Sequence, residues 1–121
     1  TTIVRSANKH TKKVPAASCV QNMALTGSLD KAVRLWDLRD RFSSTHSLVM
    51  ADVVTAVCID GNEMCCCSGN SLYLWAVRNL KSGLDSRVNA WKGLTRGLQI
   101  FSETKQIATA SVDGVVRVWK Y

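Results

Sequence analysis

The 121-residue sequence lacks several features that would each indicate a class of protein. It has no run of eighteen apolar residues, so we expect no membrane-spanning helix. Its first residues are polar and basic without an apolar stretch, so we expect no signal peptide. The chain starts at Thr1 rather than at methionine, so a fragment or a processed chain is expected. No Asn-x-Ser/Thr glycosylation site occurs.

Metal-binding and disulfide patterns are also lacking, although five cysteines are present: Cys19, Cys58, Cys65, Cys66 and Cys67. An odd number of cysteines in strand-like sequence favours free, buried thiols in a reducing compartment. We therefore expect an intracellular, cytoplasmic protein, with the nucleus as the alternative. No Cys-x-x-Cys pair exists, His10 and His46 are distant, and adjacent strand residues point to opposite faces. A zinc site is disfavoured, and no metal or other cofactor is expected.

The formal net charge of +7 is unevenly distributed. Residues 1–44 hold eight Lys or Arg against three Asp or Glu, whereas residues 45–77 hold three acids and no Lys or Arg. A nucleic-acid track needs positive charge clustered along one face. This distribution weakens such an interpretation.

A self-similar pattern is the strongest positive signal. Residues 25–38 read LTGSLDKAVRLWDL, and related patterns recur at residues 67–77 and 107–121. Each copy contains one tryptophan, and these are Trp36, Trp75 and Trp119, which lie 39 and 44 residues apart. A period of about 40–45 residues indicates a repeat architecture, in which one unit cannot bury its own apolar face.

Twelve strands and no helix are predicted. Residues 33–38 alternate in character, and Val53–Ile59 is a β-branched run followed by a hairpin turn at Asp60–Asn62. Pro15 places its strand at a sheet edge. Loops are expected at Arg39–Thr45 and Arg78–Ser86. The predicted strands are Thr1–Ser6, Val14–Val20, Met23–Ser28, Val33–Leu38, His46–Met50, Val53–Ile59, Met64–Ser68, Leu72–Val77, Arg87–Lys92, Leu98–Phe101, Gln106–Ser111 and Val115–Trp119.

These three units resemble the blades of WD-repeat β-propellers. The first has the Trp36-Asp37 pair, where the others read Trp75-Ala76 and Trp119-Lys120. The resemblance implies an all-β fold of four-stranded antiparallel sheets. Three blades are too few to close a ring of four to eight, so an incomplete ring is expected. The blades would span about 10–50, 53–92 and 94–121, with residues 1–6 as the outer strand of a preceding blade.

The resemblance also implies a structural hydrogen-bond network in each blade. A histidine, a hydroxyl, an aspartate and the tryptophan are linked in the family, so that each buried polar group finds a partner. The matching residues in the first unit are His10, Thr26, Asp30 and Trp36. The third has Thr109, Asp113 and Trp119, with Leu94 where histidine is expected. The second retains Trp75, with Cys66 and Asn70 near the hydroxyl and aspartate positions.

Catalysis by these residues is the less favoured interpretation. A hydroxyl, an imidazole and a carboxylate can form a nucleophilic triad. However, the hydroxyl lies within a strand, no Gly-x-Ser-x-Gly elbow exists, and the other units lack the histidine. We expect no enzyme and no small-molecule substrate.

The resemblance implies a protein-protein interaction scaffold whose partners are other proteins or further blades. The predicted protein-binding positions, near one rim, are Lys13, Leu29, Val53, Arg96 and Val112. One alternative is a phosphoinositide- or nucleic-acid-binding surface around the basic residues Arg5, Lys9, Lys12, Lys13 and Lys31, although the Phe-Arg-Arg-Gly signature of lipid-binding propellers is absent. Another is a purely architectural segment that completes a ring.

Overall fold

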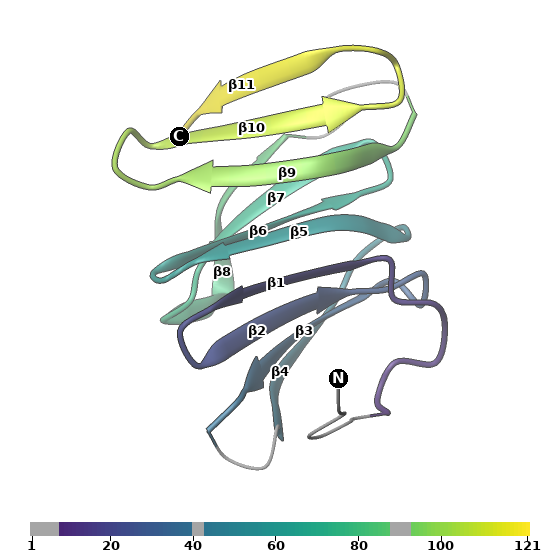
Figure 1. Ribbon diagram of the computed structural model, residues 1–121, viewed down its shortest axis with the longest axis vertical. Coiled ribbons are helices and arrows are strands. Elements are labelled where there is room, and N and C mark those ends of the chain that lie inside the picture. The colour runs from purple at the N-terminus through teal and green to yellow at the C-terminus, as the bar shows by residue number, and fades with distance from the viewer. Residues whose placement is uncertain (1–7, 40–42, 88–92) are drawn as a thin grey trace, which may run out of the picture.

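The computed structural model describes residues 8–39, 43–87 and 93–121, and these residues form eleven β-strands and no helix (Figure 1). They include no helix that could cross a membrane. The predicted strand Thr1–Ser6 and the residue Trp91 lie outside the described ranges. The strands are β1 (Ala16–Val20), β2 (Met23–Gly27), β3 (Ala32–Asp37), β4 (Ser43–Val49), β5 (Val54–Asp60), β6 (Glu63–Ser68), β7 (Ser71–Ala76), β8 (Asn79–Arg87), β9 (Thr95–Phe101), β10 (Gln106–Ser111) and β11 (Val116–Lys120).

The strands form three antiparallel sheets, in which chain neighbours are also sheet neighbours. The strand orders are β1-β2-β3-β4, β5-β6-β7-β8 and β11-β10-β9. Figure 1 shows the sheets stacked along the long axis, with β5–β8 between the other two. The first strands of the sheets, β1, β5 and β9, lie side by side in that order. One side of the stack is therefore formed by the first strand of every sheet.

The middle sheet starts with the most apolar stretch of the chain. Residues 54–59 of β5 are all buried, because this strand is covered on both of its faces. A two-residue turn at Gly61 and Asn62 joins Asp60 to Glu63, and Gly61 has the positive φ of 55° that a tight turn requires. The strand and turn predicted here are confirmed, with bounds shifted by one residue.

The first and second sheets share an apolar interface. Leu25 and Val33 contribute from the first sheet, and Met64 and Trp75 from the second. The sheets approach so closely at Gly27 that a Cβ there would collide with Val54. Fully burying one such aliphatic side chain contributes about 1.5–3 kcal/mol, so this interface is a main source of stability.

The second and third sheets share another interface on the opposite face of the middle sheet. Cys65 and Leu74 pack there with Ile100 and Ile107, and Trp119 covers the cluster. The repeated tryptophans of β3, β7 and β11 thus belong one to each sheet, as the repeat pattern predicts.

A polar contact between distant parts of the chain also joins these two sheets. Glu63 of β6 is only 7% exposed, and its Oε1 lies 2.7 Å from Lys105 Nζ. The Tyr121 hydroxyl donates a hydrogen bond to Glu63 Oε2. Burial and the Glu63 carboxylate raise the pKa of Tyr121. The C-terminal residue of this chain is thereby held against the middle sheet.

The outer strand of the middle sheet differs from its prediction. The strand predicted at Arg87–Lys92 lies outside the described residues except for Arg87. A loop was expected at Arg78–Ser86, but β8 occupies Asn79–Arg87. Its polar, glycine-containing sequence lacks the alternation of a strand. The open edge of β7 provides hydrogen-bond partners for it, through two register shifts near Trp75. Pairing with β7 outweighs local propensity at this position.

Two other strands, β4 and β9, start three residues earlier than predicted. β4 begins at Ser43, within the expected loop Arg39–Thr45, and β9 begins at Thr95 rather than at Leu98. A bulge near Ser111 lets Thr95 pair with β10. Both extensions add backbone pairing to residues that are polar or small.

Candidate functional site

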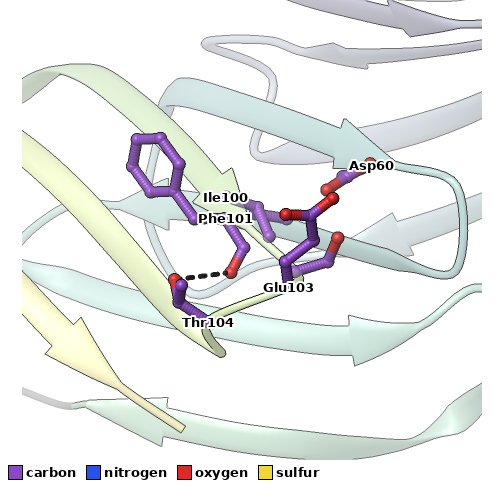
Figure 2. Close-up of a pocket in the computed structure, with 6 residues that line it drawn as sticks. Asp60, Ile100, Phe101, Glu103 and Thr104 are labelled. Carbon is purple, nitrogen blue, oxygen red and sulfur yellow. Dashed lines mark hydrogen bonds between the residues drawn. The ribbon is translucent and has the colours of Figure 1, made fainter.

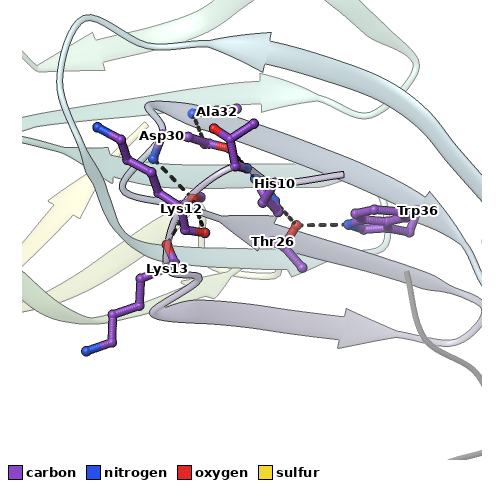
Figure 3. Close-up of polar contacts among 9 residues, drawn as sticks. His10, Lys12, Lys13, Thr26, Asp30, Ala32 and Trp36 are labelled. Carbon is purple, nitrogen blue, oxygen red and sulfur yellow. Dashed lines mark hydrogen bonds and ion pairs between the residues drawn. The ribbon is translucent and has the colours of Figure 1, made fainter. Parts of the chain in front are cut away.

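The first sheet brings four side chains into a continuous hydrogen-bond chain (Figure 3). His10 precedes β1, Thr26 lies in β2, Asp30 in the β2–β3 turn and Trp36 in β3. His10 Nδ1 lies 3.0 Å from Asp30 Oδ2, and His10 Nε2 lies 2.7 Å from Thr26 Oγ1. The Trp36 indole N–H donates to Thr26 Oγ1 over 2.8 Å. This series of hydrogen bonds therefore connects β2 and β3 to the β2–β3 turn through the His10 imidazole.

The donors and acceptors of this chain define one tautomer of His10. Because Thr26 Oγ1 accepts from the indole, its own proton is free to be donated to His10 Nε2. Nε2 is then the acceptor, and Nδ1–H donates to Asp30. Every polar group in the set is satisfied in this arrangement, which stiffens the turn.

Asp30 also organises the backbone around it. Its carboxylate accepts the N–H of Ala32 over 2.8 Å and the N–H of Thr11 over 3.1 Å. Burial alone would raise the pKa of Asp30, but these hydrogen bonds and His10 lower it to about 2. The following residue, Lys31, has a left-handed φ of 69°. The ionised carboxylate thus holds the turn in a shape that a non-glycine residue rarely adopts.

The third sheet has a related arrangement without histidine. The Trp119 indole N–H donates to Thr109 Oγ1 over 3.1 Å, as in the first sheet. Asp113 instead forms an ion pair with Arg117 of β11, with 2.9 Å between Nη2 and Oδ2. The hydrogen bond from Arg117 lowers the pKa of Asp113. Arg117 of β11 therefore supplies the side-chain donor to the aspartate in the sheet where Leu94 replaces histidine.

The middle sheet departs furthest from this arrangement. Cys66 takes the place of the hydroxyl residue, and its Sγ lies 3.8 Å from Met50 Sδ. Trp75 stacks on Tyr73 instead, with ring centroids 5.8 Å apart and planes 14° from parallel. Asn70 lies in the β6–β7 turn, which is shorter than the β2–β3 turn because only two residues separate the paired Ser68 and Ser71. The sulfur-rich packing of this sheet replaces the polar chain.

Three serines with a shared role were missed by the sequence analysis. They are Ser28, Ser68 and Ser111, and each lies two residues after the hydroxyl or cysteine position. Their Oγ atoms donate to backbone carbonyls before the first strand of the sheet, at Lys13 (2.9 Å), Asp52 (2.7 Å) and Leu94 (3.3 Å). Their spacing of 40 and 43 residues follows the tryptophan period and could have revealed them.

The predicted protein-binding residues lie where these turns meet the loops before the first strands. The Leu29 N–H donates to the Lys13 carbonyl over 3.0 Å, and the Val112 N–H donates to the Leu94 carbonyl over 2.9 Å. In the middle sheet, Gly69 N–H donates to the Val53 carbonyl over 3.1 Å. We call these paired positions the turn rim, and its members are Lys13, Leu29, Val53, Gly69, Leu94 and Val112.

Exposure differs among the positions predicted to bind protein. Lys13 and Val112 are exposed, Val112 to 60%, whereas Leu29 and Val53 are half-buried. Arg96 is exposed but lies at the bulge in β9. The residue equivalent to Lys13 is Leu94, because its carbonyl accepts the corresponding hydrogen bond from the turn, and Arg96 lies two residues beyond it. The Val54 N–H donates to the Ser28 carbonyl over 3.1 Å, so the first two sheets are joined at this rim.

Basic side chains surround the same region. Lys9, Lys12, Lys13 and Lys31 are all exposed, while Arg5 lies outside the described residues. Figure 3 shows Lys12 and Lys13 beside the His10–Asp30 contact. The turn rim of the first sheet is therefore positively charged, whereas Val112 of the third is apolar.

A cavity of about 300 Å³ lies at the other end of the sheets (Figure 2). It is lined by Asp60, Ile100, Phe101, Ser102, Glu103 and Thr104. The Thr104 hydroxyl donates to the Phe101 carbonyl over 3.4 Å, which closes part of the turn. None of the residues predicted as functional lines this cavity.

Comparisons with known proteins agree with this architecture. The sequence pattern of the WD domain, G-beta repeat family matches residues 2–37 and 85–120, more than half of the chain. The unmatched part contains most of the middle sheet, where the polar chain is lost. Mitotic checkpoint protein BUB3.3 of Arabidopsis thaliana is 27% identical over 94 residues, which are 78% of this chain and 30% of that protein.

A second relative and a solved structure extend the comparison. Cell division control protein 4 of Candida albicans is 34% identical over 83 residues, which are 68% of this chain and 10% of that protein. The chain thus spans less than a third of either relative. The crystal structure of the computationally designed Ika8 protein superposes on 97% of this chain and 36% of its own, with a TM-score of 0.83 and 19% identity. The predicted all-β fold of antiparallel propeller blades is confirmed.

Proposed function

Because the chain belongs to the WD domain, G-beta repeat family, we propose that it is a non-enzymatic scaffold for protein-protein interaction. The observation that carries the proposal is the turn rim, where rigid turns present side chains to solvent. Thr26 Oγ1 already contacts both His10 and Trp36, so it is engaged as a structural link and not as a nucleophile. The five free thiols support an intracellular setting.

The partner is proposed to combine apolar and acidic groups. Val112 offers exposed apolar surface beside a turn held by Asp113, and Lys13 offers a positive charge on the first sheet. Apolar anchors at the centre of an interface supply most of the binding energy, and charged groups at its edge supply orientation. A peptide or loop with an aliphatic side chain near acidic residues would match this rim.

A larger propeller is proposed as the setting of these sheets. The outward face of the third sheet exposes three large apolar side chains, with Phe101 at 49%, Val118 at 62% and Val116 at 72%. The middle sheet buries the corresponding face against a neighbour. Repeat units of this kind are stable when stacked. We therefore expect a further sheet, from the same polypeptide or another subunit, to cover this face.

The double variant Leu29→Asp with Val112→Asp tests the rim. Two carboxylates placed at the turn rim should reduce capture of the native partner by at least tenfold, while the far-UV circular dichroism spectrum is unchanged. Asn22→Asp with Asn62→Asp, which adds the same two carboxylates at exposed turns at the other end of the sheets, is the matched control and should retain capture. Equal capture by the double variant and the wild type would refute the rim assignment.

The basic residues around His10 keep a lipid- or nucleic-acid-binding surface as the second candidate. Phosphate-driven binding falls steeply between low and moderate salt. We expect weak binding to phosphoinositide vesicles or to nucleic acid at low salt and none at moderate salt. Retained binding at moderate salt, lost on replacing Lys9, Lys12 and Lys13 by glutamine, would favour this candidate over the scaffold.

A further inference from the structure

Two cysteines of the middle sheet face each other directly. Cys58 of β5 pairs with Cys65 of β6 in the antiparallel register, and both are free thiols. Directly opposed residues share a face and have Cα atoms about 4.5–5.5 Å apart. A disulfide requires a Cα separation of about 4.4–6.8 Å. The strand register therefore places this pair within the Cα separation that a disulfide allows.

The same register distinguishes this pair from the other strand cysteines. Cys67 lies opposite Ala56, so it has no thiol directly across from it. Cys66 lies opposite Val57 and packs in the other interface, with its Sγ 3.8 Å from Met50 Sδ. Cys58 and Cys65 both belong to the interface with the third sheet. Cys65 is therefore the only cysteine of β6 that has a cysteine directly opposite on β5.

The surroundings of Cys58 favour its ionised form. The Cys65 thiol, the Ile100 backbone N–H and the Ser18 hydroxyl lower the pKa of Cys58 to about 6, although burial opposes this. Ile100 belongs to β9 and Ser18 to β1, so all three sheets meet at this sulfur. Burial raises the pKa of Cys65 well above the ordinary value. The pKa values of the two thiols are thus shifted in opposite directions.

Accessibility also differs within the cluster. Cys58 retains 4% of its surface exposed, whereas Cys65, Cys66 and Cys67 retain none. Cys58 lies on the first strand of its sheet, at the side of the stack formed by β1, β5 and β9. A small neutral oxidant therefore reaches Cys58 before the other three.

We propose that Cys58 and Cys65 are a redox-responsive dithiol that closes to a cross-strand disulfide when the protein meets a hydroperoxide. Cys58 is the oxidised residue and Cys65 the resolving residue. The site is independent of the turn rim, because it lies in the interior between the second and third sheets.

The chemistry proceeds in two steps. The Cys58 thiolate attacks one peroxide oxygen, an S–O bond forms, the O–O bond breaks, and hydroxide or an alkoxide leaves. The sulfur loses two electrons to the peroxide and becomes a sulfenic acid. The Cys65 sulfur then attacks the Cys58 sulfur, an S–S bond forms and the S–O bond breaks. The departing hydroxide takes the Cys65 proton as water, and cellular thiols can reverse the reaction.

The test uses the folded protein with Cys19→Ser, which removes the exposed thiol. Hydrogen peroxide should consume two of the four remaining thiols, with the loss of two hydrogens in the intact mass. Cyanogen bromide cleaves after Met64, which lies between the two cysteines. The fragments on either side should remain joined until reduction. Thiol oxidation that leaves the fragments separate would overturn the proposal.

Variants then identify the partners. Cys66→Ser and Cys67→Ser should still form the link, whereas Cys65→Ser should give a sulfenic acid at Cys58 that dimedone traps. The rate of thiol loss should rise through about pH 6 and level off above it. A link that disappears in Cys67→Ser but persists in Cys65→Ser would refute the pairing. A link that forms only in urea would show that the folded structure does not bring the two cysteines together. This comparison needs no substitution at Cys58 or Cys65, so it tests the proposal even if one of those variants misfolds.

Discussion

Replacing Asp30 by asparagine is expected to destabilise the protein by removing one hydrogen-bonded charge. Burial alone would raise the pKa of this carboxyl, but hydrogen bonds from Ala32, His10 and Thr11 lower it from 3.8 to about 2. At about 1.4 kcal/mol per pH unit, this shift corresponds to about 2 kcal/mol. Solvent screening beside an exposed turn reduces the expected contribution to about 1–2 kcal/mol.

The sign of the pH dependence follows from the direction of the shift. Because the pKa of Asp30 is lower in the folded state than in the unfolded state, its contribution is fully present above about pH 4. It is lost as the pH falls towards the folded-state pKa of about 2. The asparagine variant has no proton to gain, so the difference from the wild type should shrink over this window.

Urea unfolding at a series of pH values, followed by tryptophan fluorescence, measures this difference. We expect Asp30→Asn to lower the free energy of unfolding by about 1–2 kcal/mol at pH 7 and by much less near pH 2. Glu103→Gln, which removes an exposed carboxylate from the turn at the other end, should have little effect at any pH. A difference for Asp30→Asn that stays constant across the series would show that the ionised carboxylate is not what stabilises the turn.

Two further predictions concern contacts that join strands and sheets. Thr26→Val keeps the side-chain shape but removes the hydroxyl that contacts both the Trp36 indole N–H and His10, so we expect the free energy of unfolding in urea to fall by about 1–3 kcal/mol. Thr26→Ser should recover most of this loss, and equal stability of the valine variant would contradict the network. Glu63→Gln removes the negative charge beside the Tyr121 hydroxyl, so the pKa of Tyr121 should fall towards that of free tyrosine. Absorbance at alkaline pH measures the ionisation of Tyr121, and an unchanged titration would mean that burial alone raises its pKa.

The repeat signal was sufficient to predict most of the fold. Alternation in residues 33–38 and the β-branched run Val53–Ile59 give strands because side-chain periodicity and propensity act locally. The turn at Gly61 is similarly local, since only a few residues determine its dihedral angles. The positions of His10 and Asp30 followed from a family resemblance, and the structure places their side chains 3.0 Å apart.

Other features depended on partners distant in sequence. The contact of Glu63 with Lys105 joins residues 42 apart, and that with Tyr121 joins residues 58 apart. Neither can be inferred from spacing, because each depends on how two whole sheets are stacked.

The sequence by itself determined most of the strands, the tight turns and the tryptophan of each sheet, since these depend on residues within a few positions of one another. Only the tertiary structure decided that Asn79–Arg87 is a strand and that Cys58 meets Ser18 and Ile100. The physical reason is that an edge strand obtains its hydrogen bonds from a neighbour and a buried thiol obtains its pKa from three packed sheets. Neither the edge strand nor the pKa of the buried thiol can therefore be inferred from the residues adjacent in sequence.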